Sequence, residues 1–217
     1  MPISHKLKVI FIHIPKNAGE SIEKTLGIYG LKNKDPKSKY WGVFENKIVL
    51  QHLTALQLKD SYIKNSIWDS YFKFAIIRNP WSKAVSEYNW FLRYGPQITF
   101  KEWCESLEYR IKINSMINIL ETGHNIEQYK FITDNDGNFL VDELIRFENI
   151  ENGFNNLSQK RSWKALLKNA KTTKNLSKKD WRSYYCKETL NIIEKVYKKD
   201  LDIFGYKKEE TFKNFII

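Results

Sequence analysis

The chain has 217 residues and a mass of 25.9 kDa, a size that suits one domain with a sizeable core. Hydrophobic residues make up 42% and aromatic residues 15%, which excludes a disordered or low-complexity chain. Lys and Arg total 36 against 25 Asp and Glu, a formal net charge of +11. We therefore expect an anionic partner, whether a nucleic acid, an acidic membrane surface, an anionic glycan or a nucleotide.

Cysteine usage and the N-terminus bear on the compartment. Cys104 and Cys186 lie far apart without a metal-ligand spacing, so neither a disulfide framework nor a zinc site is predicted. The apolar run at 9–14 is too short for a signal peptide, and no stretch approaches the roughly 18 apolar residues of a membrane span. We expect a cytoplasmic protein with no membrane span.

The first half of the chain alternates between predicted strands and helices. The β-branched run at 8–14 predicts a buried strand, which a loop follows before a helix begins at Ser21. A short apolar run at 47–50 predicts another strand, with His52 at its end.

Capping residues mark the next helices. The segment 53–71 is predicted to be helical with Thr54 as N-cap, and 72–77 is predicted to be a central strand ending at Arg78. Asn79 is expected to cap a helix that runs to about Tyr94 and has Pro80 in its first position.

The second half continues the alternation. Helices are predicted at 99–120, 150–160 and 182–200, strands at 129–133, 139–141 and 144–147, and a loop at 168–179. Alternating strands and helices predict a three-layer α/β domain over residues 1–217.

The loop after the first strand carries the sharpest motif. Backbone N–H groups at a helix N-terminus attract an anion, Lys16 adds a positive charge and Ser21 a hydroxyl. The predicted phosphate cradle consists of Pro15, Lys16, Asn17, Ala18, Gly19, Glu20 and Ser21. It differs from the GxxxxGK[ST] loop because the lysine precedes the glycine and no hydroxyl follows it to hold Mg²⁺. The alternative is a tight turn with a surface lysine.

A second motif lies at 78–88. Arg78 ends a predicted strand, where open α/β sheets bind ligands, and Ser86 lies two helical turns into the next helix. A guanidinium and a hydroxyl can together bind a second phosphate. The alternative is that Arg78 pairs with a carboxylate and Ser86 is a small packing residue.

Together the two motifs resemble the sulfotransferases that use 3′-phosphoadenosine 5′-phosphosulfate (PAPS), of the carbohydrate-directed type with a PKxAGxS loop and an RNPxxRxxSxY segment. The Arg-Phe-Glu-Asn run at 146–149 and the pattern from the paired tyrosines at 184–185 to Phe-Gly-Tyr at 204–206 continue the resemblance. It spans about 9–206 and implies an αβα fold whose central parallel sheet is like that of P-loop NTPases.

The resemblance implies roles for the matched residues. Lys16 would contact the 5′-phosphosulfate and stabilise the leaving phosphate oxygen, while Arg78 and Ser86 would bind the 3′-phosphate. Lys83 stands where the family usually has arginine, and we leave it out of the site. Asn175 and Ser177 match a family loop that closes over the nucleotide.

His52 is the predicted general base. The segment 51–55 is similar to the family's HxTA segment, and histidine suits the removal of a proton from an acceptor hydroxyl. Of the other histidines, His5 lies near the terminus, His13 inside the first strand and His124 in a loop. The alternative is a structural histidine.

The expected reaction transfers a sulfuryl group from PAPS to a carbohydrate hydroxyl by in-line attack and releases 3′-phosphoadenosine 5′-phosphate (PAP). No metal requirement and no nucleic-acid partner are expected. The basic excess fits an anionic glycan, whose contacts are expected in 27–46 and 92–125, where the resemblance is thinnest. No tryptophan is assigned to the acceptor, and the oligomeric state stays open.

Two other classes of function stay open. A small-molecule kinase could use the same architecture, but it would need ATP and Mg²⁺. A basic nucleic-acid-binding module fits the charge and the aromatic content, although no RNP, KH, zinc-knuckle or helix-turn-helix signature occurs. A family member that binds the nucleotide without turnover is disfavoured by the intact Lys16, His52, Arg78 and Ser86.

Overall fold

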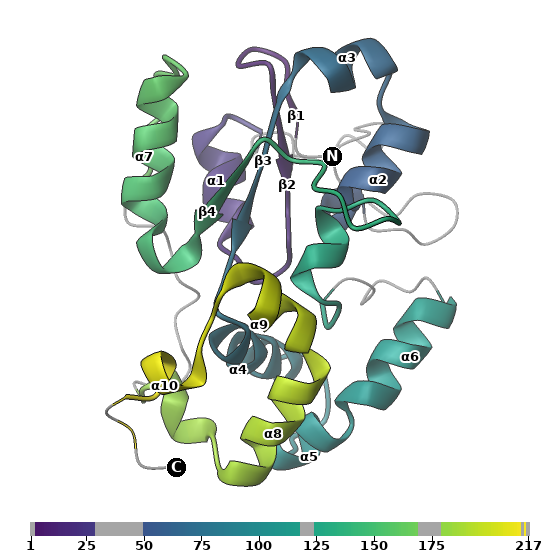
Figure 1. Ribbon diagram of the computed structural model, residues 1–217, viewed down its shortest axis with the longest axis vertical. Coiled ribbons are helices and arrows are strands. Elements are labelled where there is room, and N and C mark those ends of the chain that lie inside the picture. Colours follow the sequence, from purple (N-terminus) through teal and green to yellow (C-terminus); the bar gives the residue numbers. More distant parts are fainter. Residues whose placement is uncertain (1–2, 29–49, 118–123, 169–178, 214, 216–217) are drawn as a thin grey trace.

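A four-stranded sheet forms the centre of the computed structural model, which describes residues 3–28, 50–117, 124–168, 179–213 and 215 (Figure 1). The strands are β1 (Ile3–Ser4), β2 (Val9–Ile12), β3 (Phe72–Ile77) and β4 (Glu143–Arg146), in that spatial order. The strands β2, β3 and β4 are parallel, as predicted, whereas β1 pairs antiparallel with β2. The sheet is therefore mixed, with a parallel core.

Helices connect and flank the strands. They are α1 (Gly19–Thr25), α2 (Ala55–Gln57), a π-helical turn (Leu58–Tyr62), α3 (Asn65–Ser70), α4 (Pro80–Phe91), α5 (Phe100–Glu105), α6 (Leu107–Ile117), α7 (Ile150–Lys160), α8 (Lys187–Val196), α9 (Lys198–Phe204) and α10 (Lys208–Thr211). Short 3₁₀ helices cover Leu50–His52, Gln128–Phe131, Phe147–Asn149 and Trp181–Tyr184.

The predicted caps are confirmed. The Thr54 side chain accepts a hydrogen bond from the Gln57 backbone N–H, and the Gln57 side-chain oxygen accepts one from the Thr54 backbone N–H. The Asn79 side chain accepts from the first two free N–H groups of α4, and Pro80 occupies the first position of that helix. These caps satisfy N–H groups that have no partner within the helix.

The strand β2 and most of β3 are buried on both faces, so each face of the sheet has its own core. Val9 and Phe11 pack on one face with residues of α1 and α7, whereas Ile10 and Ile12 pack on the other with the segment from α2 to α3. Figure 1 shows α1 and α7 to one side of the strands and α2 and α3 to the other. This confirms the αβα layering and follows from the alternation of side chains along a strand.

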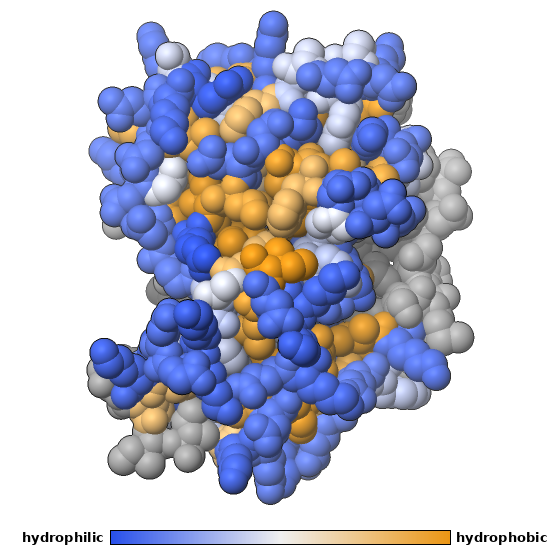
Figure 2. Space-filling model, viewed as in Figure 1, coloured by the Kyte–Doolittle hydropathy of each residue, from blue (hydrophilic) through white to orange (hydrophobic). Residues whose placement is uncertain are grey.

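A third core lies below the sheet in the view of Figure 1, where α4, α5, α8 and α9 gather. Its centre is aromatic and includes Trp81, Trp103 and Tyr185, each buried. Figure 2 shows hydrophobic surface over the sheet in the upper half of the same view, surrounded by hydrophilic residues. Within the described ranges, none of the helices has the length and apolar character that a membrane crossing needs.

Several predicted elements were wrong or incomplete. The helix expected at 53–71 breaks into α2, the π-helical turn and α3. Residues 129–131 belong to a 3₁₀ helix instead of a strand, because the buried Asp200 carboxylate accepts from two successive backbone N–H groups there; only a single bridge joins Thr133 to Phe139. The helix expected at 182–200 breaks into a 3₁₀ turn, α8 and α9. His52 ends a 3₁₀ helix, not a strand, and 47–49 lie outside the described residues.

Ile76 tests this layering, because it is fully buried in the middle strand of the parallel core. Ile76→Ala is expected to lower the free energy of unfolding by about 2–5 kcal/mol and Ile76→Val by about 0.5–1.5 kcal/mol, in chemical denaturation. The control is Ile203→Ala, since Ile203 is 40% exposed. Equal losses for Ile76→Ala and Ile203→Ala would contradict the arrangement.

Candidate functional site

The two predicted phosphate-binding loops meet at one edge of the sheet. In the parallel register Ile12 of β2 lies opposite Ala75 of β3, so the chain leaves both strands at the same end. The loops touch there, because the Arg78 guanidinium donates from Nη1 to the backbone oxygen of Lys16 at 2.9 Å. The structure thus brings together the two segments that the sequence places 62 residues apart.

The loop between β2 and α1 has an unusual backbone. Lys16 and Ala18 have φ angles of 66° and 60°, the left-handed region that non-glycine residues seldom adopt. Such conformations cost on the order of 1 kcal/mol each and persist where surrounding contacts hold them. Asn17 supplies the contacts: its buried amide donates to the Ile76 backbone oxygen at 2.7 Å and to Gln128 Oε1 at 2.8 Å. Strained backbone of this kind concentrates at ligand sites.

The His13 ring leaves no room for a side chain at Gly19. A Cβ atom at this position would lie 1.9 Å from Nε2 of His13, so the ring occupies the space that any side chain would need. The ring is held in turn, since His13 Nδ1 lies 2.7 Å from the buried Glu23 carboxylate, to which Gln51 also donates at 3.0 Å. His13 is therefore hydrogen-bonded, and it follows β2 instead of lying within the first strand as expected.

Gln128 joins the two loops, and the sequence did not single it out as a site residue. Its Oε1 accepts from Asn17 Nδ2 at 2.8 Å and from the Arg78 backbone N–H at 2.9 Å, while its Nε2 donates to the Arg78 backbone oxygen at 2.8 Å. The side chain is fully buried, and Asp200 accepts from its backbone N–H at 2.8 Å. One amide thus fixes the spacing between the loops.

Arg78 is a cation without a carboxylate partner in the described part of the chain. Its Nε donates to Ser82 Oγ at 2.9 Å, and its guanidinium lies 4.2 Å from the ring centre of Phe147. Burial lowers its pKa to about 10, opposed by the charge of Glu148, so the group stays protonated at neutral pH. Ser86, the other predicted ligand, is half-buried, and no described residue hydrogen-bonds to its hydroxyl.

Lys16 is a second such cation. It forms no ion pair with the described residues, and its Nζ lies 5.9 Å from the ring centre of Trp90. Burial lowers its pKa; Glu87 opposes this, whereas the charges of Arg93 and Arg78 lower it further. Two neighbouring cations that form no ion pair with a described residue are suited to bind an anion.

Lys83, which the sequence left out of the site, is structural. It is 1% exposed and donates to Glu87 at 2.9 Å and to the backbone oxygen of His124 at 2.8 Å. Burial would raise the pKa of Glu87, but Lys83 and His124 outweigh it and lower that pKa. Lys83 thus forms a buried ion pair with Glu87, and it cannot contact a ligand without breaking that pair.

His52 has a defined tautomer. Its Nδ1 lies 3.1 Å from the His13 backbone oxygen, and because a carbonyl only accepts, Nδ1 carries the hydrogen and Nε2 the lone pair. The His52 ring stands edge-on to the rings of His13 and His124, with centroids 4.6 and 5.4 Å apart. Burial and these two neighbours lower its pKa well below the usual value, so His52 is neutral at neutral pH.

His124 belongs to the same site, although the sequence placed it only in a loop. It is buried, its Nδ1 lies 2.8 Å from Glu87, and its ring stacks on Trp90 at 4.1 Å. No spacing in the sequence indicates this, because Glu87 and His124 meet only through the packing of the chain against α4. Gln128 likewise reaches Asn17 and Arg78 only through the fold, whereas Ser82 is four residues from Arg78 along the chain.

The remaining predicted site residues differ in exposure. Pro15 is buried, Glu20 is exposed, and Ser21 is half-buried with a hydroxyl to which no described residue hydrogen-bonds. Asn175 and Ser177 lie outside the described residues. In the ranges that are described, no group of three or more His, Cys, Asp or Glu residues is arranged to hold a metal ion.

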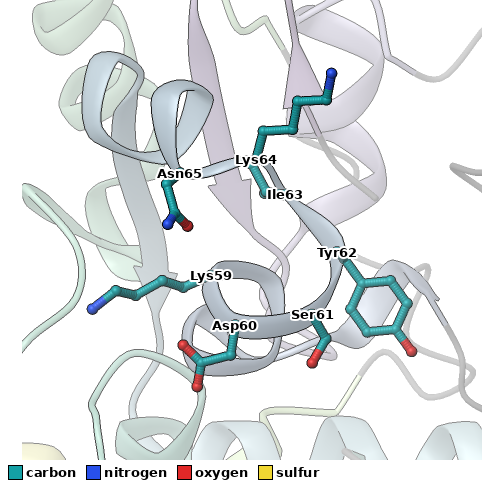
Figure 3. A pocket seen from close by; sticks show the side chains of 7 residues that line it. All are labelled: Lys59, Asp60, Ser61, Tyr62, Ile63, Lys64 and Asn65. Atoms are coloured by element: carbon teal, nitrogen blue, oxygen red, sulfur yellow. The ribbon is translucent and has the colours of Figure 1, made fainter.

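A cavity of about 500 Å³ lies elsewhere, at the turn between α2 and α3, and is lined by residues 59–65. Figure 3 shows Lys59, Asp60, Ser61 and Tyr62 pointing away from the turn in different directions. Side chains that diverge in this way do not converge on a ligand. None of the predicted site residues lines this cavity.

A model of the sulfotransferase family matches residues 1–207 of the 217. No curated protein and no solved structure matches the chain.

The contact of Gly19 with His13 can be tested by a double-mutant cycle. Gly19→Ala is expected to lower the free energy of unfolding by about 1–3 kcal/mol, because the new methyl group overlaps the ring. In the His13→Ala background the same change should cost at least about 1 kcal/mol less, since the space is then free. Thermal and chemical denaturation of the four proteins measures the coupling. Additive effects would show that the ring does not exclude the methyl group.

Proposed function

The chain belongs to the sulfotransferase family, and on that premise we propose that it transfers a sulfuryl group from PAPS to a hydroxyl group of a carbohydrate. PAPS carries a 5′-phosphosulfate and a 3′-phosphate on one adenosine. A protein that binds it needs two anion sites at a fixed separation.

One observation carries the proposal: two cations without carboxylate partners among the described residues stand at the ends of neighbouring parallel strands. The guanidinium of Arg78 donates to the backbone of Lys16, and Gln128 holds both loops in place. A guanidinium presents several N–H donors in a plane, which suits a phosphate group. We assign the 5′ end of the donor to Lys16 and the 3′-phosphate to Arg78 and Ser86.

Unsatisfied polar groups around the loops support this fit. The hydroxyls of Ser21 and Ser86 have no hydrogen-bond partner among the described residues. Hydroxyls beside a cation can donate to phosphate oxygens. The left-handed backbone at Lys16 and Ala18 lies in the same loop and fits close approach of an anion to the main chain.

The mechanism assigns one task to each of two side chains. When bound, PAPS supplies the sulfuryl group, and its phosphate leaves as part of PAP. His52 accepts the proton of the acceptor hydroxyl at Nε2, the nitrogen that its hydrogen bond to His13 leaves free. Lys16 neutralises the charge that develops on the leaving phosphate oxygen.

Binding of PAP tests the assignment of Arg78. Titration calorimetry in metal-free buffer is expected to show binding of PAP and much weaker binding of ADP, because ADP lacks the 3′-phosphate. Arg78→Ala should weaken PAP binding by at least about tenfold, the usual consequence of losing a charge-assisted contact, and should abolish the preference over ADP.

The matched control is Arg161→Ala, since Arg161 is exposed at the end of α7 and packs on Phe72. It should leave PAP binding unchanged. Tighter binding of ATP with Mg²⁺ than of PAP would contradict the proposal and favour a kinase.

The pH dependence of the reaction tests His52. Its pKa lies well below 6.5, so the neutral form that accepts a proton persists as the pH falls and is lost only below that lowered pKa. The ratio kcat/KM for PAPS should therefore stay level from neutral pH down past 6.5. An acidic limb centred at or above 6.5 would contradict the role of His52, as would a His52→Gln variant that retains wild-type kcat.

A further inference from the structure

The end of α4 carries an aromatic pair beside the two proposed reactive side chains. Trp90 lies in the last turn of α4, and Arg93 and Tyr94 follow directly after the helix. The sequence assigned no tryptophan to the acceptor but expected acceptor contacts within 92–125. The argument below rests on the proposed function, because it takes Lys16 and His52 as the reactive side chains.

Trp90 connects these side chains in space. Its ring stacks on His124 with centroids 4.1 Å apart and planes 17° apart, and His124 stands edge-on to His52 at 5.4 Å. The ring centre also lies 5.9 Å from Nζ of Lys16. A group in contact with Trp90 is therefore within one side chain of both the proposed base and the proposed leaving-group stabiliser.

Tyr94 extends the aromatic surface outward. Its ring centre lies 5.4 Å from that of Trp90, with the planes inclined by 56°, and the residue is 77% exposed. In contrast, Trp81 and Trp103 are buried in the core below the sheet. An exposed aromatic residue next to a reactive site is a binding feature, because aromatic faces pack well against the C–H faces of sugar rings.

Arg93 adds a positive charge at the same place. It is exposed and forms no ion pair with any described residue, yet its charge is close enough to Lys16 to help lower the pKa of that lysine. Cations held near one another without a carboxylate repel, and an anionic ligand relieves the repulsion. The 5′ and 3′ ends of PAPS are already assigned to Lys16 and Arg78, so Arg93 is available to the acceptor.

We propose that Trp90, Arg93 and Tyr94 form the acceptor subsite and that the sugar bound there carries a carboxylate group, with its ring against the aromatic pair and its carboxylate at Arg93. The subsite selects uronate-containing glycans over neutral ones. These three residues bind the acceptor, whereas the loops that contain Lys16 and Arg78 bind PAPS.

The test measures acceptor binding separately from donor binding. Wild-type protein saturated with PAP is titrated with hexasaccharides of hyaluronan, unsulfated chondroitin and heparosan, which contain uronate, and with maltohexaose and cellohexaose, which are neutral. At least one uronate probe should bind, and neither neutral probe should bind as tightly. Trp90→Ala and Arg93→Ala should each weaken that binding by at least about tenfold, as for central contact residues, while the Kd for PAP changes less than about twofold.

Matched controls separate the subsite from general effects. Phe139→Ala and Arg161→Ala remove an exposed aromatic residue and an exposed arginine elsewhere and should change neither binding constant. Trp90→Phe keeps an aromatic face and should retain most of the affinity, which guards against a folding defect in Trp90→Ala.

Three outcomes would overturn the proposal: no uronate probe binds although PAP does, a neutral probe binds as tightly, or both alanine variants bind like wild type. Failure of PAP itself to bind would instead contradict the proposed function.

Discussion

Parallel pairing of β2 with β3 is the constraint on which the site depends. Because Ile12 and Ala75 lie in register, the chain leaves both strands at one edge, and Lys16 and Arg78 come within reach of each other. Strand pairing alone places both loops at one edge of the sheet, but it does not set the distance between the loops. The buried amide of Gln128 sets it, by bonding to Asn17 on one loop and to both backbone groups of Arg78 on the other.

Buried charges hold the proposed base in place. His52 stands between His13 and His124, and each of these neighbours is hydrogen-bonded to a buried carboxylate, Glu23 in one case and Glu87 in the other. Burying a carboxylate is costly unless it is paired, so these contacts resist rearrangement. The tautomer and the surroundings of His52 are therefore fixed before any substrate binds, as preorganised catalysis requires.

Much of the fold could be predicted from the sequence, because its signals are local. The apolar runs that form β2 and β3, and the caps at Thr54 and Asn79, depend on residues a few positions apart. The strand expected at 129–133 was wrong because a distant residue, Asp200, satisfies two backbone N–H groups there and stabilises a 3₁₀ helix. A local sequence pattern cannot predict a hydrogen bond to a residue some seventy positions away.

The residues of the candidate site also fall into two groups, those that sequence motifs predict and those that only the fold brings together. The sequence motifs named Lys16 and Arg78, and the structure brings them together. They did not name His124, which reaches the site only through the fold, where it meets Glu87 of α4 and the ring of Trp90. Residues whose neighbours along the chain carry no motif are found only from packing.

The central claim is that Lys16 and Arg78 hold opposite ends of one nucleotide, and ³¹P NMR of bound PAP tests it most directly. The two phosphorus atoms of PAP give separate resonances, so each variant can be assigned to one end. The account predicts that Arg78→Ala returns the 3′ resonance toward its free position and leaves the 5′ resonance near its bound position, and that Lys16→Ala does the reverse. If either substitution moves both resonances alike, or moves the wrong one, the assignment of the two loops is contradicted.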